Sequence, residues 1–267
     1  MPAGQPRRLV FLCIGLIAGL AGGLLGVGGG FLLVPLQVMW AGASQRVANA
    51  TSVAALLPIG AVGAVTYYLG SPTPRVDPPL AALLAAGSVT GVLLGARLSL
   101  RVSERRLQLA VTAVLALAAA KQLLVPALTL AGGHLMASGP PAAVAAVITG
   151  LAVGTLTGSV AVGGAIVLVP TLVLVFGLEQ HVAQGTSLTT VVATSLVGAL
   201  AHARYGNVDL PAAAWMGAGG ACSVVAGAVL ALHLPTELLG RAFGLVLAHA
   251  AYRLWAQGRE VRSGAGR

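Results

Sequence analysis

Two glycine-rich stretches in apolar surroundings are the residues best suited to bind a ligand. The first, GVGGGFLLVP, spans residues 26–35, and the second, AVGGAIVLVP, spans residues 161–170. Consecutive glycines let the backbone turn and leave peptide N–H groups uncovered by side chains. A helix that begins after such a turn directs its unpaired N–H groups and the positive end of its dipole towards it, which favours an anion. The candidate backbone residues are Gly28, Gly29, Gly30, Gly163, Gly164 and Ala165.

Hydroxyl and amide side chains follow both glycine stretches at the same distance, in the sequences ANATS and AQGTS. The candidate side chains are Asn49, Thr51, Ser52, Gln184, Thr186 and Ser187. Serine and threonine at the start of a helix cap its free N–H groups, and the same hydroxyls can face a bound oxyanion. Both interpretations remain open for these residues. Pro35 and Pro170 are predicted to kink their helices and to support the site without touching the ligand.

The positions of the acidic residues argue against catalysis and against a cation substrate. All six lie in loops or at the ends of apolar segments: Asp77, Glu104, Glu179, Asp209, Glu237 and Glu260. A proton relay or cation site needs a carboxylate at membrane depth, where insertion of the charge costs about 2.5–3.5 kcal/mol. No HExxH motif occurs, so we expect no metal, no cofactor and no enzyme activity. An intramembrane enzyme that pairs Ser52 or Ser187 with His202 is the least supported alternative.

The elements that position these groups must cross a membrane. Of the 267 residues, 57% are hydrophobic and only 8% are charged, which is too few to cover a soluble domain. Apolar runs of about 17–22 residues recur, the length that crosses a bilayer as a helix. We therefore predict an all-α polytopic membrane protein. The net charge of +9 comes from loops and tails, where basic residues set membrane orientation, and no nucleic-acid partner is expected.

The two glycine stretches belong to an internal repeat. Residues 15–52 and 150–187 share 17 identities in 38 ungapped positions. The match continues at a slightly shorter offset, where Asp77 meets Asp209. We predict a first repeat over 9–127, a connector over 128–140 and a second repeat over 141–256, with tails at 1–8 and 257–267.

Each repeat contains five apolar segments, of which the second is short, about 14 residues. The predicted segments are 9–26, 30–43, 49–70, 79–98, 107–127, 142–162, 165–178, 183–203, 210–232 and 238–256. At 1.5 Å per residue, a 14-residue helix spans only about 20 Å and cannot cross upright. Segments one and two therefore form a hairpin with a glycine tip, either re-entrant or fully crossing.

Loop charge predicts the orientation of the two repeats. With a hairpin at the start of each repeat, the N-terminal arginines, the basic loop over 97–106 and the basic C-terminal tail all fall on one side. The repeats are then inverted, and both termini are cytoplasmic. Irregular backbone at membrane depth must be covered by protein or water, so the two glycine tips are expected to meet inside the bundle.

The paired motifs resemble the TauE/SafE family, the sulfite-exporter type of membrane permease. The matching residues are GLIAGLAGGLLGVGGGFLLVP with ANATS, and GLAVGTLTGSVAVGGAIVLVP with AQGTS. The resemblance covers nearly the whole chain and implies a cytoplasmic-membrane transporter of a small anion: sulfite, a sulfonate or a related organic anion. Ala161 and Ala165 depart from the glycines of the first repeat.

The sequence thus favours a secondary transporter, with an anion channel of the same fold as the alternative. The expected partners are a small anionic solute and the lipid bilayer. Neither the substrate, the direction of transport, the coupling ion nor the oligomeric state follows from the residues.

Overall fold

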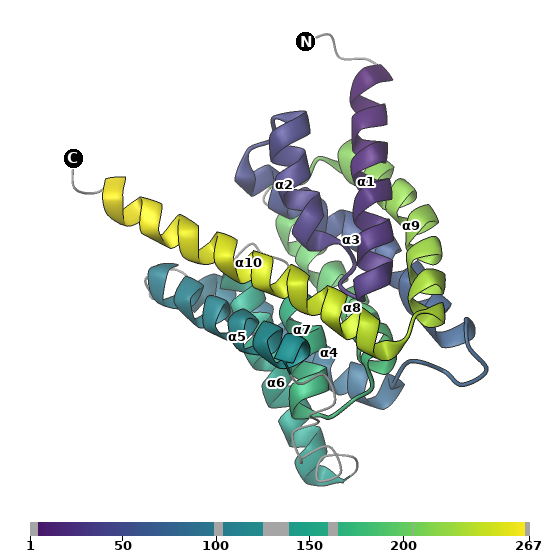
Figure 1. Ribbon diagram of the computed structural model, residues 1–267. Coiled ribbons are helices and arrows are strands. Elements are labelled where there is room, and N and C mark those ends of the chain that lie inside the picture. The colour runs from purple at the N-terminus through teal and green to yellow at the C-terminus, as the bar shows by residue number, and fades with distance from the viewer. Residues whose placement is uncertain (1–4, 99–103, 125–138, 160–164, 205, 265–267) are drawn as a thin grey trace.

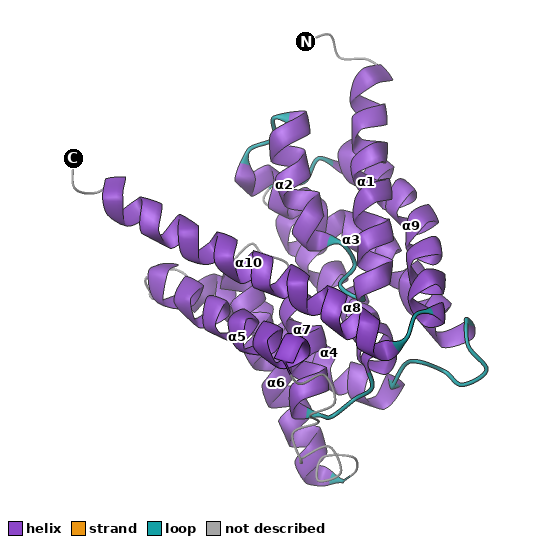
Figure 2. Ribbon diagram, viewed as in Figure 1, coloured by secondary structure: helices purple, strands orange, loops and turns teal. Residues whose placement is uncertain are grey.

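The computed structural model is entirely helical over the residues it describes, which are 5–98, 104–124, 139–159, 165–204 and 206–264 (Figure 2). These residues form ten helices, one for each predicted apolar segment. The first repeat contributes α1 (Gln5–Leu25), α2 (Gly30–Ala41), α3 (Gln45–Leu69), α4 (Pro78–Leu98) and α5 (Glu104–Leu124). The second contributes α6 (Pro140–Ser159), α7 (Ala165–Val175), α8 (Gln180–Arg204), α9 (Leu210–His233) and α10 (Thr236–Gly264).

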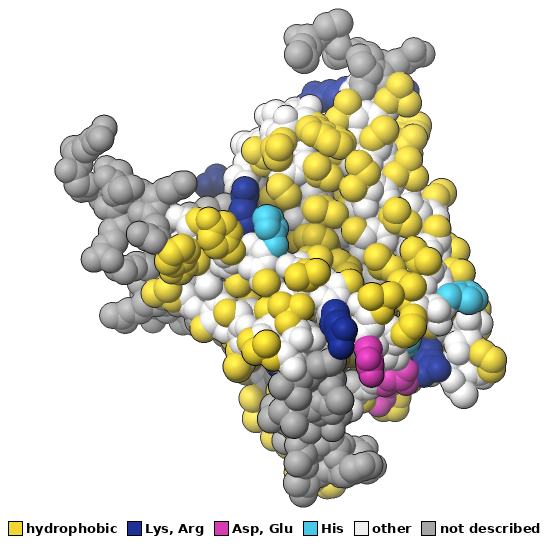
Figure 3. Space-filling view, in the orientation of Figure 1, with side chains coloured by type: hydrophobic (Ala, Val, Ile, Leu, Met, Phe, Trp, Pro, Cys, Tyr) yellow, Lys and Arg dark blue, Asp and Glu magenta, His cyan; other side chains and the backbone are white. Residues whose placement is uncertain are grey.

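Four of the described helices are long and apolar enough to cross a membrane: α1, α3, α8 and α9. Side chains on their outer faces are apolar as well as exposed, including Leu20, Leu69 and Leu200. In Figure 3, apolar side chains are spread across the described part of the visible face, and charged side chains are few. A soluble monomer rarely exposes so continuous an apolar surface, whereas lipid covers it at no cost. The fold is that of a helical membrane protein.

The helices pack in pairs that the repeat relates to one another (Figure 1). Helix α1 packs against α9, and their repeat equivalents α6 and α4 pack together in the same way. Helix α3 packs against its own equivalent α8, and α5 packs against its own equivalent α10. Each repeat is therefore interleaved with the other, and neither forms a separate bundle.

Glycines allow the close approach of α1 to α9. A side-chain carbon at Gly15, Gly19 or Gly23 would overlap the backbone of Met216, Gly220 or Val224, in that order along both helices. This ordered set of contacts shows that α1 and α9 run parallel, with small residues four apart at the interface. In the second repeat Gly150 and Gly154 meet α4 in the same manner. These spaced glycines therefore serve helix packing.

Helices α3 and α8 cross at the centre of the molecule and run antiparallel. Gly60 lies against Leu188 and Val192, whereas Gly198, near the other end of α8, lies against Val53. The end of α8 therefore lies at the start of α3. Asp209, just before α9, binds Thr51 near the start of α3, and α1 runs parallel to α9, so α1 begins at this end of the molecule too. Arg7, Arg8, Arg46 and Arg204 thus belong to this end.

Helices α3 and α8 begin earlier than the sequence analysis predicted. Helix α3 starts at Gln45, with Ser44 as its N-cap, and α8 starts at Gln180. The hydroxyl of Ser44 accepts a hydrogen bond from Val47 N at 3.4 Å. The polar residues at these starts suggested loops, but one cap at Ser44 is enough to begin the helix.

Candidate functional site

The first glycine turn lies inside the bundle. Gly26, Gly28 and Gly29 have φ angles of 72°, 67° and 82°, which favour glycine because a Cβ atom would be strained there. All residues from 26 to 30 are buried. Gly29 is the N-cap of α2, and its carbonyl accepts from Leu32 N at 2.9 Å and Leu33 N at 3.1 Å. The first amides of α2, at Gly30 and Phe31, have no acceptor within their own helix.

This turn belongs to the first repeat but packs on a helix of the second. A side-chain carbon at Gly26 would overlap Gln184 on α8. A carbon at Gly28 would lie 3.0 Å from Leu56 Cδ2 on α3, and 3.8 Å from Leu188 Cδ2 on α8. The turn is therefore held where α3 and α8 cross. Gly163 and Gly164 of the second stretch lie outside the described residues, and Ala165 is the first residue of α7.

The two threonines of the candidate set make equivalent contacts across the repeats. Thr51 Oγ1 accepts a hydrogen bond from Asp209 N at 3.1 Å, and Thr186 Oγ1 accepts one from Asp77 N at 3.0 Å. Each aspartate in turn caps the helix that follows it, through Leu80 N or Ala212 N, both at 3.0 Å. The threonines lie about two turns inside α3 and α8. The interpretation that they cap their own helices is therefore wrong.

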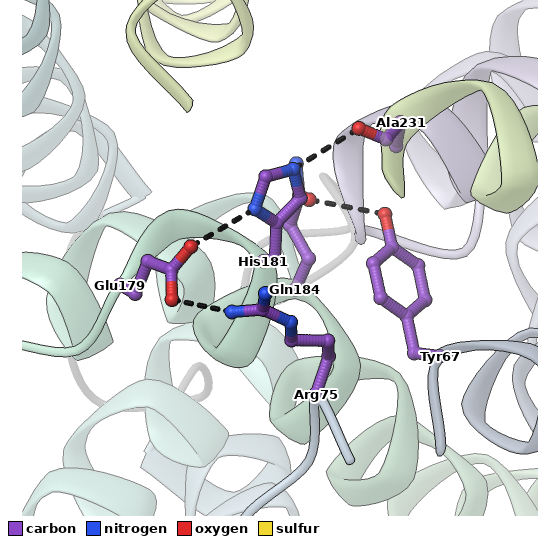
Figure 4. A network of polar contacts seen from close by, with 6 residues as sticks. All are labelled: Tyr67, Arg75, Glu179, His181, Gln184 and Ala231. Atoms are coloured by element: carbon purple, nitrogen blue, oxygen red, sulfur yellow. Dashed lines mark hydrogen bonds and ion pairs between the residues drawn. The ribbon is translucent and has the colours of Figure 1, made fainter. Parts of the chain in front are cut away.

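Gln184 braces the glycine turn. Its Nε2 donates to Leu24 O at 3.1 Å, and its Oε1 accepts from the Tyr67 hydroxyl at 3.0 Å (Figure 4). The Tyr67 hydroxyl also lies 2.8 Å from Gly23 O. Tyr67 and Gln184 are both fully buried. Asn49, the equivalent of Gln184, is partly buried, and its Oδ1 has no hydrogen-bond partner among the described residues.

The two serines of the candidate set differ. In the first repeat Gln37, on α2, donates from Nε2 to Ser52 Oγ at 2.6 Å, and also to Leu33 O and Ala48 O. In the second repeat Leu172 stands at the position of Gln37. Ser187 is fully buried, and its hydroxyl has no hydrogen-bond partner in the described part of the chain.

The prolines occupy equivalent places. Pro35 and Pro170 are each the sixth residue of a short helix, α2 or α7. A proline has no N–H group to bond to the preceding turn, so each of these helices lacks one backbone hydrogen bond at the same position in its sequence.

A charged cluster outside the predicted set lies at the end of the molecule opposite Arg7 and Arg46. Arg75 Nη1 donates to Glu179 Oε2 at 2.6 Å, and Glu179 Oε1 lies 3.2 Å from His181 Nδ1 (Figure 4). His181 Nε2 lies 3.0 Å from Ala231 O, a group that can only accept, so Nε2 carries a proton. The cluster joins the loop after α3, the start of α8 and the end of α9.

Sequence reasoning missed Gln37, Tyr67 and this cluster. Gln37 could have been identified from the sequence, because it is a single amide in a short apolar segment. The sequence gives no indication of the ion pair, because 104 residues separate Arg75 from Glu179 and the repeat places no ion pair at the equivalent residues.

The comparisons with known proteins agree with the fold. A model of the family described as "Sulfite exporter TauE/SafE" matches residues 2–122 and 146–267. The chain belongs to the TauE/SafE family. This family is one of membrane transporters and not of enzymes. The family assignment does not favour the channel alternative.

Two curated relatives of this TauE/SafE chain carry compatible names. It is 36% identical over 86 residues to the "Probable membrane transporter protein YdhB" of Bacillus subtilis (strain 168), which is 32% of this chain and 35% of that protein. It is 43% identical over 63 residues to "Sulfite exporter TauE/SafE family protein 3" of Arabidopsis thaliana, which is 23% of this chain and 13% of that protein. The matched part is therefore about a third of the first relative and less of the second. No solved structure matches the TauE/SafE chain.

Proposed function

We propose that this TauE/SafE transporter moves a small anion, namely sulfite, a sulfonate or a related organic anion, across the cytoplasmic membrane. The observation that carries the proposal is the first glycine turn, which is buried and closed against α8 of the other repeat. Backbone amides at such a turn stabilise a negative charge without a cationic side chain. The printed name of the Arabidopsis relative includes sulfite export, which supports this substrate class.

The transporter works by alternating access between two inverted repeats, 9–127 and 141–256, joined by 128–140. The antiparallel crossing of α3 and α8, which are repeat equivalents, supports the inversion. In this scheme the second glycine tip, with Gly163, Gly164 and Ala165, approaches from the opposite side and completes the site. Asn49, Thr51, Ser52, Gln184, Thr186 and Ser187 line or brace it.

The end that carries Arg7, Arg8, Arg46 and Arg204 faces the cytoplasm, as do both termini. The grouping of four arginines at one end supports this orientation. The end with Arg75, Glu179 and His181 then faces outward.

Glycine substitutions test the site. Gly28 and Gly42 have almost the same φ, 67° and 64°, so alanine at either position introduces a similar backbone strain, about 1 kcal/mol. Gly42 lies at the end of α2, and a side-chain carbon there meets nothing within 4 Å. We expect Gly28→Ala to lower sulfite flux into proteoliposomes at least about tenfold. Gly42→Ala should keep flux within about twofold.

The thermal unfolding midpoints of the two variants control for folding, and they should fall by similar amounts. Equal flux in both variants, at equal stability, would contradict the site. Failure of the wild-type protein to move sulfite, sulfonates, sulfate or small carboxylates would contradict the anion proposal itself. Saturable slow flux, without unitary currents in bilayer recordings, identifies a carrier.

A further inference from the structure

We infer that the transport site is asymmetric: the Ser187 hydroxyl, which has no partner among the described residues, binds the anion, whereas its repeat equivalent, Ser52, is tied to Gln37. The inference rests on the proposed function, because it assigns a ligand group within the same site. The ligand class is a small oxyanion, whose oxygen atoms accept a hydrogen bond from the hydroxyl.

The state of the Ser187 hydroxyl is unusual for its helix. Thr189, Thr190 and Thr194 on α8 each donate to a carbonyl of the preceding turn, at 2.9–3.3 Å. The Ser187 hydroxyl makes no such bond, although the residue is 0% exposed. A buried polar group without a partner is costly, and the great majority of such groups in proteins are paired. A ligand oxygen gives this hydroxyl the partner that the described residues do not.

In the first repeat, the oxygen of the equivalent serine has a partner. Ser52 receives the Gln37 amide at 2.6 Å from the neighbouring short helix. Helix α7 packs on α8 as α2 packs on α3, and Leu172 replaces the amide with an apolar side chain. The second repeat has therefore lost the internal partner while it keeps the serine.

The position of Ser187 connects it with the glycine turn. Gln184 and Leu188, three residues before it and one after, both contact residues 26–28, as does Val191, four residues after it. The spacings of three and four residues, to Gln184 and Val191, place Ser187 on the same helix face as these two side chains. The Ser187 side chain therefore emerges from the face of α8 that packs on the turn, beside α7. Since the hydroxyl is fully buried, an anion reaches it when α7 and α8 separate, the kind of motion that alternating access supplies.

Three other buried atoms lack partners among the described residues and fit an anion less well. Asn49 Oδ1 is an acceptor and repels negative charge. The Ser88 hydroxyl lies on α4 at its interface with α6, where Gly154 approaches Ser88 closely. Gln180 lies at the start of α8, with its Oε1 bound by Gln122 Nε2 at 2.9 Å. Asn49 and Ser88 lie on other helices than Ser187, and Gln180 is held by Gln122 at the end of α8 that bears the charged cluster.

Removal of the hydroxyl is the first test. In proteoliposomes loaded to measure sulfite flux, Ser187→Ala should weaken the apparent affinity for sulfite about tenfold to a hundredfold, the range expected for a bond to a charged ligand. Thr190→Val is the matched control. Thr190 is equally buried on the same helix, but its hydroxyl donates to Thr186 O, so its loss should leave the affinity within about twofold.

A second pair of variants tests the role of the missing amide. Leu172→Gln restores the partner that Gln37 provides in the first repeat, and should engage Ser187 and lower flux at least about tenfold. Leu172→Met keeps the volume without an amide and should retain flux. Monodisperse elution and an unchanged unfolding midpoint establish that both variants fold.

The outcomes separate the inference from the function it rests on. Wild-type sulfite flux with unchanged affinity in Ser187→Ala overturns the asymmetric site and leaves anion transport standing. Flux in Leu172→Gln equal to that in Leu172→Met also overturns it. Absence of anion flux in the wild-type protein overturns the proposed function instead.

Discussion

At the scale of single residues, most of the candidate side chains brace the fold, whereas Asn49 Oδ1 and the Ser187 hydroxyl have no partner among the described residues. Thr51, Thr186 and Gln184 bind backbone groups or a buried tyrosine, and they hold helices in place. The Ser187 hydroxyl has no hydrogen-bond partner in the described part of the chain. Types and spacing identified all four as candidates, but only the contacts separate the groups already engaged from the one that is not.

Tyr67 offers a test at this scale. Its single hydroxyl proton lies between Gly23 O and Gln184 Oε1, so Tyr67→Phe leaves these two buried acceptors without the donor that they share. We expect the free energy of unfolding to fall by about 1–3 kcal/mol, measured by denaturation in detergent. Tyr68→Phe is the control, because Tyr68 is 45% exposed and should change stability little. Equal effects of the two substitutions would contradict the bracing role.

The Arg75–Glu179 pair should matter far less to stability. Both side chains are partly exposed, at 30% and 44%, and solvent screens such pairs to about 1 kcal/mol or less. Glu179→Gln should therefore change the thermal unfolding midpoint by only a few degrees. A loss of folded protein in this variant would contradict this expectation and show that the fold needs the junction between the start of α8 and the end of α9.

At the scale of elements, segment lengths and the repeat were sufficient to predict the ten helices that the described residues form. Segment lengths and the repeat could not predict which side chains of distant segments bind one another. The Tyr67–Gln184 bond joins residues 117 apart, and no periodicity in one sequence encodes such a pairing. The starts of α3 and α8 were misplaced because Gln45, Arg46 and Gln180 are polar, although they extend an apolar helix past the lipid.

The α1–α9 interface provides the prediction for this scale. Gly19→Val would force a side chain into the backbone of Gly220 and the hydroxyl of Ser223. Overpacking of this kind costs about 1–3 kcal/mol or more, so the yield of folded protein should drop sharply. Ile17→Val, on the exposed face of the same helix, should leave the yield unchanged. Size-exclusion profiles of the two variants measure the difference.

At the scale of the whole molecule, charge distinguishes the two ends. Four arginines mark one end, and the Arg75–Glu179–His181 cluster marks the other. On the face seen in Figure 3, the acidic side chains gather near the edge away from the N-terminus. This arrangement underlies the proposed orientation in the membrane.

Thiol labelling tests that orientation. In a background with Cys13 and Cys222 replaced, Gln45→Cys and Thr73→Cys place single exposed thiols at opposite ends. A membrane-impermeant maleimide added to intact cells should modify the cysteine at position 73 and spare the one at position 45. Permeabilised cells should show modification of both. The reverse pattern in intact cells would invert the proposed topology.

The reciprocal threonine–aspartate contacts bear on how the protein is made. The Thr51 hydroxyl meets an amide that is synthesised 158 residues later, and the start of α4 depends on Thr186, 109 residues beyond Asp77. The N-terminal repeat therefore enters the bilayer before Thr186, which binds the residue preceding α4, has been synthesised. The first repeat therefore cannot complete its fold until the second repeat has been synthesised. Co-expression of the two repeats as separate fragments should yield folded protein, whereas either fragment expressed alone should not.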